Sequence, residues 1–475
     1  IGYYLPIKNN KSVHKKSFEI LRPFFESNKI IKVGHNIKFD IQVLHKYNVK
    51  VSSPIYDTMV AHYLINPDMR HNLDTLSESY LNYSPISIES LIGKKGKNQI
   101  SMRDISIDKI TDYASEDADI TLQLKSVFDK EVEVNNLGKI FYDIEIPMIN
   151  VLSEMETEGI KIDTSYLEKL DKEFEEDLEK LKNEIFKKSG EEFNLNSPKQ
   201  LGEILFDKLK LVSKPKKTKT GQYSTSEEVL SSLANDHKII EDILEWRSLD
   251  KLQNTYVKSL PNEVSSLTNR VHSSFNQTVT TTGRLSSNNP NLQNIPIRTA
   301  NGQKIRRAFI PRGSDYILMA ADYSQIELRV IASMSNEENM IDAFVNNQDI
   351  HTMTASKIYN VDPENVTREQ RGNAKTVNFG IIYGVSAFGL SQQTDLNRSE
   401  SKVMIDNYFL NYPGLKKYMS DQIDFARNNG YVETIMGRRR YLQNINSQNN
   451  MLRSGSERNA INAPIQGSAA DIIKI

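Results

Sequence analysis

The chain has 475 residues, a length that corresponds to several domains with sizeable cores. Lys and Arg number 60 against 61 Asp and Glu, so the formal net charge is −1 and there is no overall basic excess of the kind that marks many nucleic-acid-binding proteins. With no cysteine, no signal-like N-terminus and no long apolar stretch, the composition argues against a disulfide scaffold or a membrane protein and predicts a cytoplasmic one.

The first block of the chain, from residue 1 to about residue 130, mixes short apolar segments with helical patterns. We expect strands at Ile1 to Ile7 and at Ile30 to Gly34, because both segments are apolar and of strand length. Strands that alternate with helices in this way predict an α/β fold for the block.

The second block, from about residue 145 to 265, is predicted to be mostly helical. Apolar residues recur at helical spacing among charged ones and predict one long helix from near Asp163 to Lys188. The recurring positions are Leu167, Leu170, Phe174, Leu178, Leu181 and Ile185. A loop rich in Pro, Gly, Lys and Thr is expected from Ser213 to Ser226.

Basic residues gather in two stretches although the whole chain is nearly neutral. The first holds Lys199, Lys208, Lys210, Lys214, Lys216, Lys217 and Lys219, and the second holds Arg427, Arg438, Arg439, Arg440, Arg453 and Arg458. Local basic stretches are typical of surfaces that contact a phosphate backbone. A solvated loop is the alternative for each stretch.

An apolar run of strand length at residues 316 to 321 is followed directly by Asp322. An acid at the end of a buried strand can hold a hard cation at the rim of a sheet. Taken alone, Asp322 could equally be the N-cap of a helix. Glu327 and Arg329 follow on the next segment.

The segment RGNAKTVNFGIIYG, residues 371 to 384, carries the most informative pattern. In a helix, Arg371, Lys375, Phe379 and Tyr383 stand four residues apart and share one face. Two cations followed by two rings suit a nucleoside triphosphate, with Gly384 as a candidate helix terminator. An ordinary amphipathic helix is the alternative for this segment alone. Together with Asp322 at a predicted strand end upstream, the pattern favours a phosphoryl-transfer site, which needs metal and cations around a polyphosphate.

DYSQIELR (322 to 329) and RGNAKTVNFGIIYG resemble motifs A and B of family A DNA polymerases. The resemblance continues through TVTTTGRLSSNNPNLQNIPIR (278 to 298), YVETIMGRRRYL (431 to 442) and ERNAINAPIQGSAAD (457 to 471). VGHNIKFD (33 to 40) and YASEDAD (113 to 119) resemble the second and third motifs of that family's 3′→5′ proofreading domain. The motifs span nearly all of the chain in the expected order.

The resemblance implies a multidomain fold of mixed α/β and α+β class. A ribonuclease H-like 3′→5′ exonuclease domain is expected over residues 1–130 and a right-hand polymerase over residues 131–475. Within the polymerase we expect the thumb at about 145–265, the palm at about 266–340 and 456–475, and the fingers at about 341–455.

The resemblance also assigns a nucleotide site. Asp322, with the main-chain carbonyl of Tyr323, would bind two Mg²⁺ ions, and Glu327 would act as the steric gate against a ribose 2′-hydroxyl. Arg371 and Lys375 would neutralise the phosphates and act in catalysis. The full set implied to bind the dNTP is Tyr323, Gln325, Glu327, His351, Arg298, Arg371, Lys375, Phe379 and Tyr383.

A second implied set contacts the DNA. Arg284 follows Gly283 and would reach the minor-groove edge of the primer terminus, where acceptors are nearly independent of sequence. Arg458, Asn462 and Gln466 stand four apart on one expected helix face. Asn294 is implied as a further DNA contact.

In the proofreading block, Tyr113 and Asp117 stand at i and i+4, so the phenol can orient a water beside a metal-bound carboxylate. Asp40 would supply a second metal-binding carboxylate. An exposed acid is the alternative for Asp40 or Asp117 taken singly. Asp57 is expected to cap a helix that begins near Thr58 instead of binding metal.

The resemblance places two family motifs outside the 475 residues. The Asp-x-Glu motif of the exonuclease would precede Ile1, and the polymerase His-Asp-Glu motif, absent from the sequence, would follow Ile475. We therefore expect a piece of a longer protein that is inactive on its own. The expected partners are primer-template DNA and dNTPs, with no membrane and a monomeric state.

Two other functions remain open from the sequence. A non-catalytic DNA-binding protein could have kept the fold and lost the metal sites. A single-subunit RNA polymerase is disfavoured by Glu327 together with Phe379 and by the exonuclease-like block. Flanking sequence that contains both missing motifs would favour the DNA polymerase over the non-catalytic protein.

Overall fold

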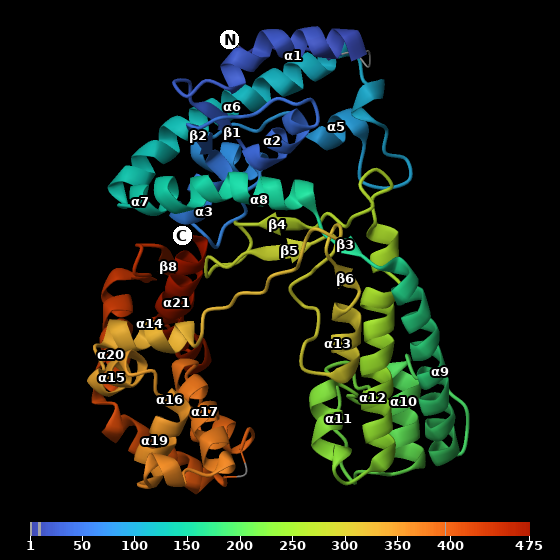
Figure 1. Ribbon diagram of the computed structural model, residues 1–475, viewed down its shortest axis with the longest axis vertical. Helices are drawn as coiled ribbons and strands as arrows, with labels where there is room; N and C mark the ends of the chain where they lie inside the picture. The colour runs from blue at the N-terminus through green and yellow to red at the C-terminus, as the bar shows by residue number, and fades with distance from the viewer. Residues whose placement is uncertain (1, 8–10, 395) are drawn as a thin grey trace. The chain divides into compact units, whose positions relative to one another are not determined.

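The computed structural model describes residues 2–7, 11–394 and 396–475, without the side chains of residues 11–14 and 382. Its described residues are mostly helical, with four two-stranded sheets (Figure 1). The chain forms two compact units. Unit 1 comprises Ile1–Met155, here the N-terminal block, Asn276–Ser286, the central segment, and Ala321–Ile475, the C-terminal block. Unit 2 comprises Glu156–Phe275 and Ser287–Ala320.

The N-terminal block is a small α/β arrangement. Its elements are α1 (Lys11–Phe25), β1 (Lys32–Gly34), α2 (Ile37–His45), β2 (Ile55–Asp57), α3 (Thr58–Ile65), α4 (Leu73–Leu76), η1 (Ser77–Leu81), α5 (Ile88–Ile92), η2 (Met102–Asp104), α6 (Ile107–Val134), α7 (Gly138–Ile140), η3 (Phe141–Glu145) and α8 (Ile146–Glu158). β1 and β2 pair in parallel with Val33 opposite Tyr56, and α3 and α6 contribute to the hydrophobic core.

The strand expected at Ile1 to Ile7 is not observed in the described residues 2–7. Ile1 lies outside the described residues. Tyr3 is 87 % exposed and Leu5 is 55 % exposed, so the apolar side chains have no core to cover. The strand expected at Ile30 to Gly34 is confirmed as β1, because the buried β2 supplies its hydrogen-bonding partner.

Unit 2 is built around a long amphipathic helix. Its elements are β3 (Lys161–Ile162), α9 (Thr164–Ser189), α10 (Pro198–Gly202), η4 (Glu203–Lys208), α11 (Glu227–Ala234), α12 (Lys238–Leu252), η5 (Gln253–Val257), η6 (Leu260–Glu263), β4 (Ser274–Asn276), β5 (Ser286–Asn288), α13 (Ala300–Arg306) and β6 (Phe309–Ile310). The first residues of β4 and the last of β5 belong to unit 2.

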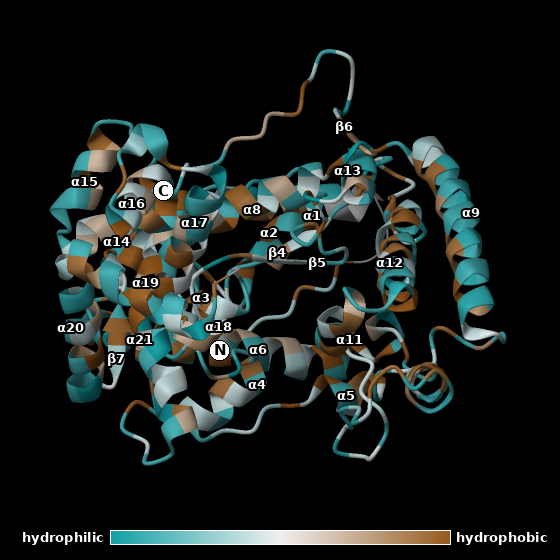
Figure 2. Ribbon diagram, turned by 90° about the horizontal axis from the view of Figure 1, so that it is seen from below, coloured by the Kyte–Doolittle hydropathy of each residue, from teal (hydrophilic) through white to brown (hydrophobic). Residues whose placement is uncertain are grey.

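The predicted long helix is confirmed as α9. The Asp163 side chain accepts from the Tyr166 N–H and caps the first turn, and Gly190, with φ +75°, ends the helix. Leu167, Leu170 and Phe174 are buried and form the stripe that packs in the same core as Trp246 of α12. Hydrophobic and hydrophilic residues alternate around α9 accordingly (Figure 2).

The C-terminal block is largely helical. Its elements are α14 (Ile326–Ser335), α15 (Glu338–Val345), α16 (Ile350–Tyr359), η7 (Pro363–Asn365), α17 (Arg368–Ile382), α18 (Ala387–Ser391), α19 (Arg398–Asn411), α20 (Pro413–Asn429), β7 (Tyr431–Glu433), β8 (Arg439–Tyr441) and α21 (Asn450–Lys474). One core joins α14 to α20 with α21, and a smaller one lies beneath the β7–β8 hairpin.

The strand expected at residues 316 to 321 is wrong for this structure. The segment is extended without a strand partner among the described residues, and Ile317 and Met319 are 88 % and 84 % exposed. In Figure 2 it is the extended trace after β6 with predominantly hydrophobic colours. An apolar run becomes a buried strand only where another strand and a core receive it.

No helix in the described ranges has the length and apolar character that crossing a membrane requires.

Candidate functional site

The predicted helix with the cation–ring face is confirmed as α17. A capping box between Thr367 and Gln370 begins it, which satisfies the first free backbone N–H groups. The opposite face is buried, while Arg371 and Lys375 are exposed and Phe379 is half-buried. Tyr383 is the C-cap residue, and the turn ends with Gly384 at φ +69°. The helix therefore presents the four side chains in the order that the spacing predicts.

Arg371 is paired in this structure. Its Nε donates to Asp349 Oδ2 at 2.6 Å, and Asp349 also caps α16 by accepting from the His351 N–H at 3.0 Å. Burial opposes ionisation of Asp349, but the hydrogen bonds from Arg371, the His351 N–H and Thr352, with the Arg371 charge, together outweigh it and lower the pKa of Asp349. A triphosphate that used Arg371 would compete with this carboxylate, whereas Lys375 is exposed beside it.

His351 is buried, with 1 % of its surface exposed. Its ring nitrogens lie 3.0 Å from Asn378 Nδ2 and 3.2 Å from Gln325 Nε2. Burial lowers the pKa of His351 to about 4, so the ring is neutral at pH 7. The phosphate role implied for His351 stays a prediction, and a neutral ring would fill it by donating a hydrogen bond instead of charge.

Glu327, near the start of α14, bonds side chains from two distant segments. Its Oε1 accepts from Arg284 Nη2, and its Oε2 accepts from the Tyr383 hydroxyl at 2.5 Å. The Glu327 side chain is only 11 % exposed, while that of Arg284 is 55 % exposed. Burial and Glu327 raise the pKa of Tyr383 to about 12, so the phenol keeps its proton and donates. The proposed steric gate thus contacts both a nucleotide-site and a primer-site candidate.

The predicted face of α21 lies against the end of α17. Arg458 packs over Gly384, where an added Cβ would come within 2.7 Å of Arg458 Cγ, and Gln466 hydrogen-bonds Tyr383. Asn462 Oδ1 is buried and has no hydrogen-bond partner among the described residues. Because Gly384 also needs a positive φ, a side chain there would disturb both the turn and the Arg458 contact.

Asp322 and Tyr323 lie in the exposed segment before α14. The N-cap of α14 is Gln325 at φ +56°, so Asp322 is not the helix cap. A carboxylate and a main-chain carbonyl are oxygen donors that suit Mg²⁺, which often binds one or two carboxylates together with waters and substrate phosphates. In the described part of the chain, no three His, Cys, Asp or Glu side chains gather as a metal site.

Arg298 and Asn294 belong to unit 2 and are exposed. The Asn294 carbonyl accepts from the Tyr256 hydroxyl at 2.6 Å, which fixes the main chain at this exposed residue. Their roles at the dNTP and the DNA stay predictions.

The proofreading candidates lie on α2 and α6. Burial raises the pKa of Tyr113 to about 12, with a further contribution from its hydrogen bond to Asp117, so the i, i+4 pair forms as predicted. Burial and the Asp57 charge raise the pKa of Asp40 to about 6. Asp57 accepts from the Met59 and Val60 N–H groups, which confirms it as the cap of α3.

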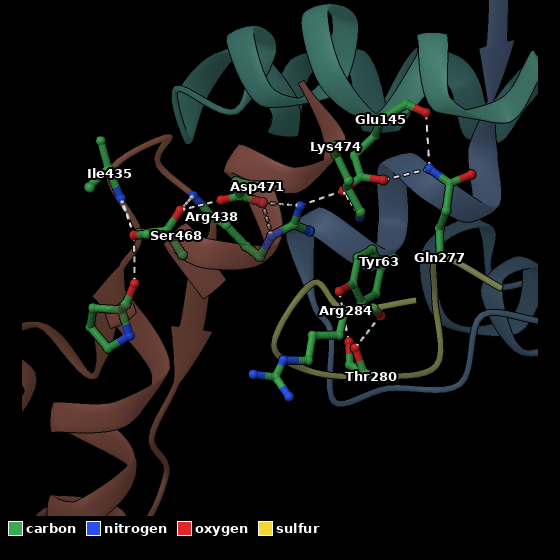
Figure 3. Close-up of polar contacts among 12 residues, drawn as sticks. Tyr63, Glu145, Gln277, Thr280, Arg284, Ile435, Arg438, Ser468, Asp471 and Lys474 are labelled. Atoms are coloured by element: carbon green, nitrogen blue, oxygen red, sulfur yellow. Dashed lines mark hydrogen bonds and ion pairs between the residues drawn. The ribbon is translucent and has the colours of Figure 1, made fainter. Parts of the chain in front are cut away.

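A buried ionic cluster in unit 1 was missed at the sequence level (Figure 3). Arg438 donates to Asp471 from Nε at 2.9 Å and to Glu145 from Nη2, and Lys474 donates to Glu145 at 2.6 Å. Gln277 Nε2 adds a bond to Glu145 Oε2 at 2.5 Å. All four charged side chains are at most 4 % exposed, and two cations balance two anions. Burial opposes ionisation, but Arg438 and Lys474 hold the pKa of Glu145 down to about 2.

The neighbouring arginines of β8 also have internal partners. Arg439 donates to Asn135 at 2.6 Å and to Glu433 at 2.9 Å, and Arg440 pairs with Asp68. The expectation that this basic stretch contacts DNA phosphates is therefore wrong for Arg438, which is buried. It is not supported for Arg439 and Arg440, which are bound to the N-terminal block.

Comparison with known proteins agrees with this arrangement. The profile described as DNA polymerase family A matches residues 164–475, and the profile described as 3'-5' exonuclease matches residues 2–133. Because the family A profile matches well over half of this chain, the chain belongs to DNA polymerase family A.

Several bacterial relatives of the chain are called DNA polymerase I. That of Borreliella burgdorferi is 45 % identical over 477 residues, covering 100 % of this chain and 52 % of the relative. That of Pseudomonas aeruginosa is 44 % identical, covering 96 % of this chain and 50 % of the relative. The chain thus spans about half the length of the curated relatives it matches.

A solved structure has the same fold. It is the POL domain of Pol1 from M. smegmatis in complex with DNA primer-template and dNTP, with a TM-score of 0.86 and 37 % identity. The match covers 97 % of this chain and 77 % of that one. The predicted fold class, an exonuclease domain with a polymerase domain, is confirmed by this likeness and by the two profiles.

Proposed function

We propose that the protein to which this chain belongs is a template-directed DNA polymerase with 3′→5′ proofreading that acts in DNA replication and repair. It adds dNTPs to a primer 3′ end by phosphoryl transfer. The observation that carries the proposal is the contact of Arg284, Glu327 and Tyr383, which are far apart in sequence and belong to three polymerase-like motifs. An amphipathic helix with a purely structural role would not require that convergence.

The nucleotide site is proposed on the exposed face of α17. Lys375 and Arg371 meet the triphosphate, Phe379 lies beside the sugar and base, and Tyr383 closes the pocket at the base. Glu327 excludes a 2′-hydroxyl because its carboxylate is held in place from two sides. Gln325, His351 and Arg298 complete the nucleotide-binding set.

The DNA set is proposed as Arg284 with Asn294, Arg458, Asn462 and Gln466. Arg284 is the most exposed member of the Glu327 cluster, and its guanidinium can donate to a minor-groove acceptor. Asn462 Oδ1 has no hydrogen-bond partner among the described residues, and the amide Nδ2 of this side chain has two N–H donors for a template strand.

Divalent metal is proposed at both sites, as Mg²⁺ with two ions each. Asp322 and the Tyr323 carbonyl would hold it in the polymerase site, and Asp40 and Asp117 in the exonuclease site. The metal would supply charge stabilisation for phosphoryl transfer or hydrolysis. Tyr113 holds its hydroxyl against Asp117 and can orient a water there.

We also propose a domain boundary at residue 130, with the thumb at about 145–265, the palm at about 266–340 and 456–475, and the fingers at about 341–455. The protein is proposed to be a cytoplasmic monomer without membrane association that has primer-template DNA and dNTPs as partners. The expectation that the 475 residues alone neither extend nor shorten a primer also stays a prediction.

One assay tests the function with the full-length protein. A 5′-labelled primer-template should lengthen with Mg²⁺ and four dNTPs and shorten when dNTPs are left out. Asp322→Ala should abolish lengthening and keep shortening, and Asp117→Ala should do the reverse. Tight, salt-sensitive DNA binding with neither reaction would support the non-catalytic alternative.

A further inference from the structure

The segment that carries Arg284 is held by residues outside the proposed nucleotide site. The Thr280 hydroxyl donates to the Arg284 carbonyl at 2.6 Å and closes a short loop. The Tyr63 hydroxyl, on α3, donates to the Thr280 carbonyl at 2.7 Å, and the Gly283 main chain hydrogen-bonds Tyr63 (Figure 3). The Tyr63 phenol thus fixes the loop to the N-terminal block, and just before the loop Gln277 bonds to Glu145 and Thr278 contacts Met59 Sδ.

The other side of the loop rests on the ionic cluster. An added Cβ at Gly283, which has φ +80°, would lie 2.5 Å from Arg438 Nε. The Arg438 guanidinium also lies 5.7 Å from the centre of the Tyr63 ring. Because Glu145 and Asp471 hold Arg438 from both sides, neither the arginine nor the glycine can shift independently.

Tyr63 is rigid enough to position the loop. It is 1 % exposed, and its ring contacts His71 edge-on at 5.7 Å. A buried hydroxyl with one carbonyl acceptor directs that carbonyl with little freedom.

We propose that Tyr63, within the exonuclease-like part of the chain, is a positioning residue for Arg284 in primer extension. It fixes the main chain from Thr280 to Arg284. When the Arg284 guanidinium leaves Glu327, only its side chain has to reorient to reach the primer terminus. This inference rests on the proposed polymerase function and adds a dependence of that site on the N-terminal block.

The test uses Tyr63→Phe in the full-length protein, which removes one hydroxyl and keeps the ring. Loss of the neutral hydrogen bonds of this hydroxyl to Thr280 and Gly283 should lower kcat/KM for correct dNTP addition by at least about 3-fold. In an Arg284→Ala background the same change should cost less than about 2-fold, because coupled residues are not additive. Equal losses in the two backgrounds, or no loss beside wild-type Arg284, would overturn the proposal.

A matched control removes a hydroxyl from the same block. Tyr80→Phe deletes the bond from the Tyr80 hydroxyl to His62 Nε2, and no contact of Tyr80 with the loop is observed in the described residues. It should leave primer extension unchanged. Tyr63→Phe should also leave excision of single-stranded DNA unchanged, and a fall in both reactions would instead indicate general unfolding and overturn the proposal.

A modified primer gives a readout that a structural role would not move. A primer that ends in 3-deazaadenine lacks the minor-groove N3 acceptor. With this primer the difference between wild type and Tyr63→Phe should vanish, and a persistent difference would overturn the proposal. Thr280→Val, which removes the second bond of the loop, should behave like Tyr63→Phe in every arm. If wild type extends no primer at all, the proposed function fails and not this inference alone.

Discussion

At the scale of single residues, Glu327 does two things at once. Its carboxylate occupies space at the proposed sugar position, and it holds Arg284 and Tyr383 by hydrogen bonds. Any substitution therefore alters the shape of the site and the partners of two other side chains together.

Glu327→Ala is expected to admit ribonucleotides, because it removes the wall against the 2′-hydroxyl. It should also lower total incorporation, since Tyr383 and Arg284 lose a partner whose charged hydrogen bonds are worth about 1.5–3 kcal/mol each. Single-nucleotide incorporation with dNTP and NTP measures both effects.

Glu327→Gln is the matched control for that change. It keeps the volume and one acceptor oxygen, so selection against NTPs should remain while Arg284 is held more weakly. An unchanged dNTP-to-NTP ratio for Glu327→Ala would show that Glu327 is not the gate.

Spacing within a helix can be predicted from the sequence, whereas contacts between distant residues cannot. The four-residue spacing of Arg371, Lys375 and Phe379 predicts one face because a helix is a local structure. The Arg284–Glu327 and Tyr383–Glu327 contacts join residues 43 and 56 positions apart, and no local pattern encodes such a pairing.

At the scale of elements, the two cations of α17 differ in whether they have a charged partner. Arg371 is satisfied by Asp349, whereas Lys375 projects from an exposed position. The lysine is therefore the more specific probe of phosphate binding, because its removal leaves no carboxylate unpaired among the described residues.

Lys375→Ala is expected to reduce the incorporation rate about 10²–10³-fold, as losses of electrostatic stabilisation at a reacting centre typically do. Primer-template affinity should change little. Pre-steady-state incorporation and DNA titration separate the two, with the exposed Lys402→Ala on α19 as the control. Weakened DNA binding with normal incorporation in the bound complex would assign Lys375 to the duplex.

Two histidines, His62 on α3 and His71, are expected to make the stability of the N-terminal block depend on pH. His62 Nδ1 lies 2.8 Å from His71 Nδ1, His62 Nε2 lies 3.1 Å from the Tyr80 hydroxyl, and His35 is the other charge-bearing neighbour. Burial lowers the pKa of His62 to about 3 and that of His71 to about 4. Both are therefore neutral when folded and take up protons only after unfolding as pH falls below 6.5.

The histidines should accordingly contribute a stability that is constant above pH 7 and declines as pH falls from about 6.5 toward 4, and the raised pKa of Asp40 should offset part of that decline below about pH 6. Thermal melts at pH 7.5, 6.0 and 5.0 measure this, and His71→Gln should flatten the decline. His45→Gln removes an exposed histidine of the same block and is the control. A melting temperature that is constant over this range would contradict the assignment.

The long helix α9 and the helix α17 were predicted from the sequence, whereas two apolar segments predicted to be strands are not strands in the described part of the structure. α9 carries its own signals, with Asp163 as a cap and Gly190 as a stop, so the chain alone defines it. Residues 2–7 and 316–321 carry only an apolar pattern, and pairing depends on a strand elsewhere. Exposed Ile317 shows that such a pattern does not specify its own partner.

At the scale of the whole molecule, the ionic cluster joins the N-terminal block, the central segment and the C-terminal block of unit 1. Breaking a buried ion pair by removing one partner typically costs about 3–5 kcal/mol, because the remaining charge is stranded. Arg438 faces two buried carboxylates, so its loss strands both.

Arg438→Met should therefore lower the free energy of unfolding by at least the lower part of that range. Arg440→Ala breaks a more exposed pair on the same strand and should cost about 0–1 kcal/mol. Urea titrations of the two variants compare them directly. Equal stabilities would mean that Lys474 alone neutralises Glu145 and that Asp471 is stable unpaired.

The cluster could not be predicted, because three adjacent arginines look like a phosphate-binding surface in a sequence. Burial of Arg438 depends on Glu145, which lies 293 residues away. The overall organisation was accessible for a different reason, since many short motifs in a fixed order constrain a chain more than any single one.

Three consecutive arginines that each contact a different residue of the N-terminal block limit how freely parts can be exchanged with a relative. Each arginine donates to its own partner: Arg438 to Glu145, Arg439 to Asn135 and Arg440 to Asp68. Of these three partners only Asp68 lies within residues 1–130, the expected exonuclease range, whereas Asn135 and Glu145 follow it. A hybrid with a foreign module over residues 1–130 should therefore keep the partners of Arg438 and Arg439 and lose that of Arg440, unless an acid is retained at position 68.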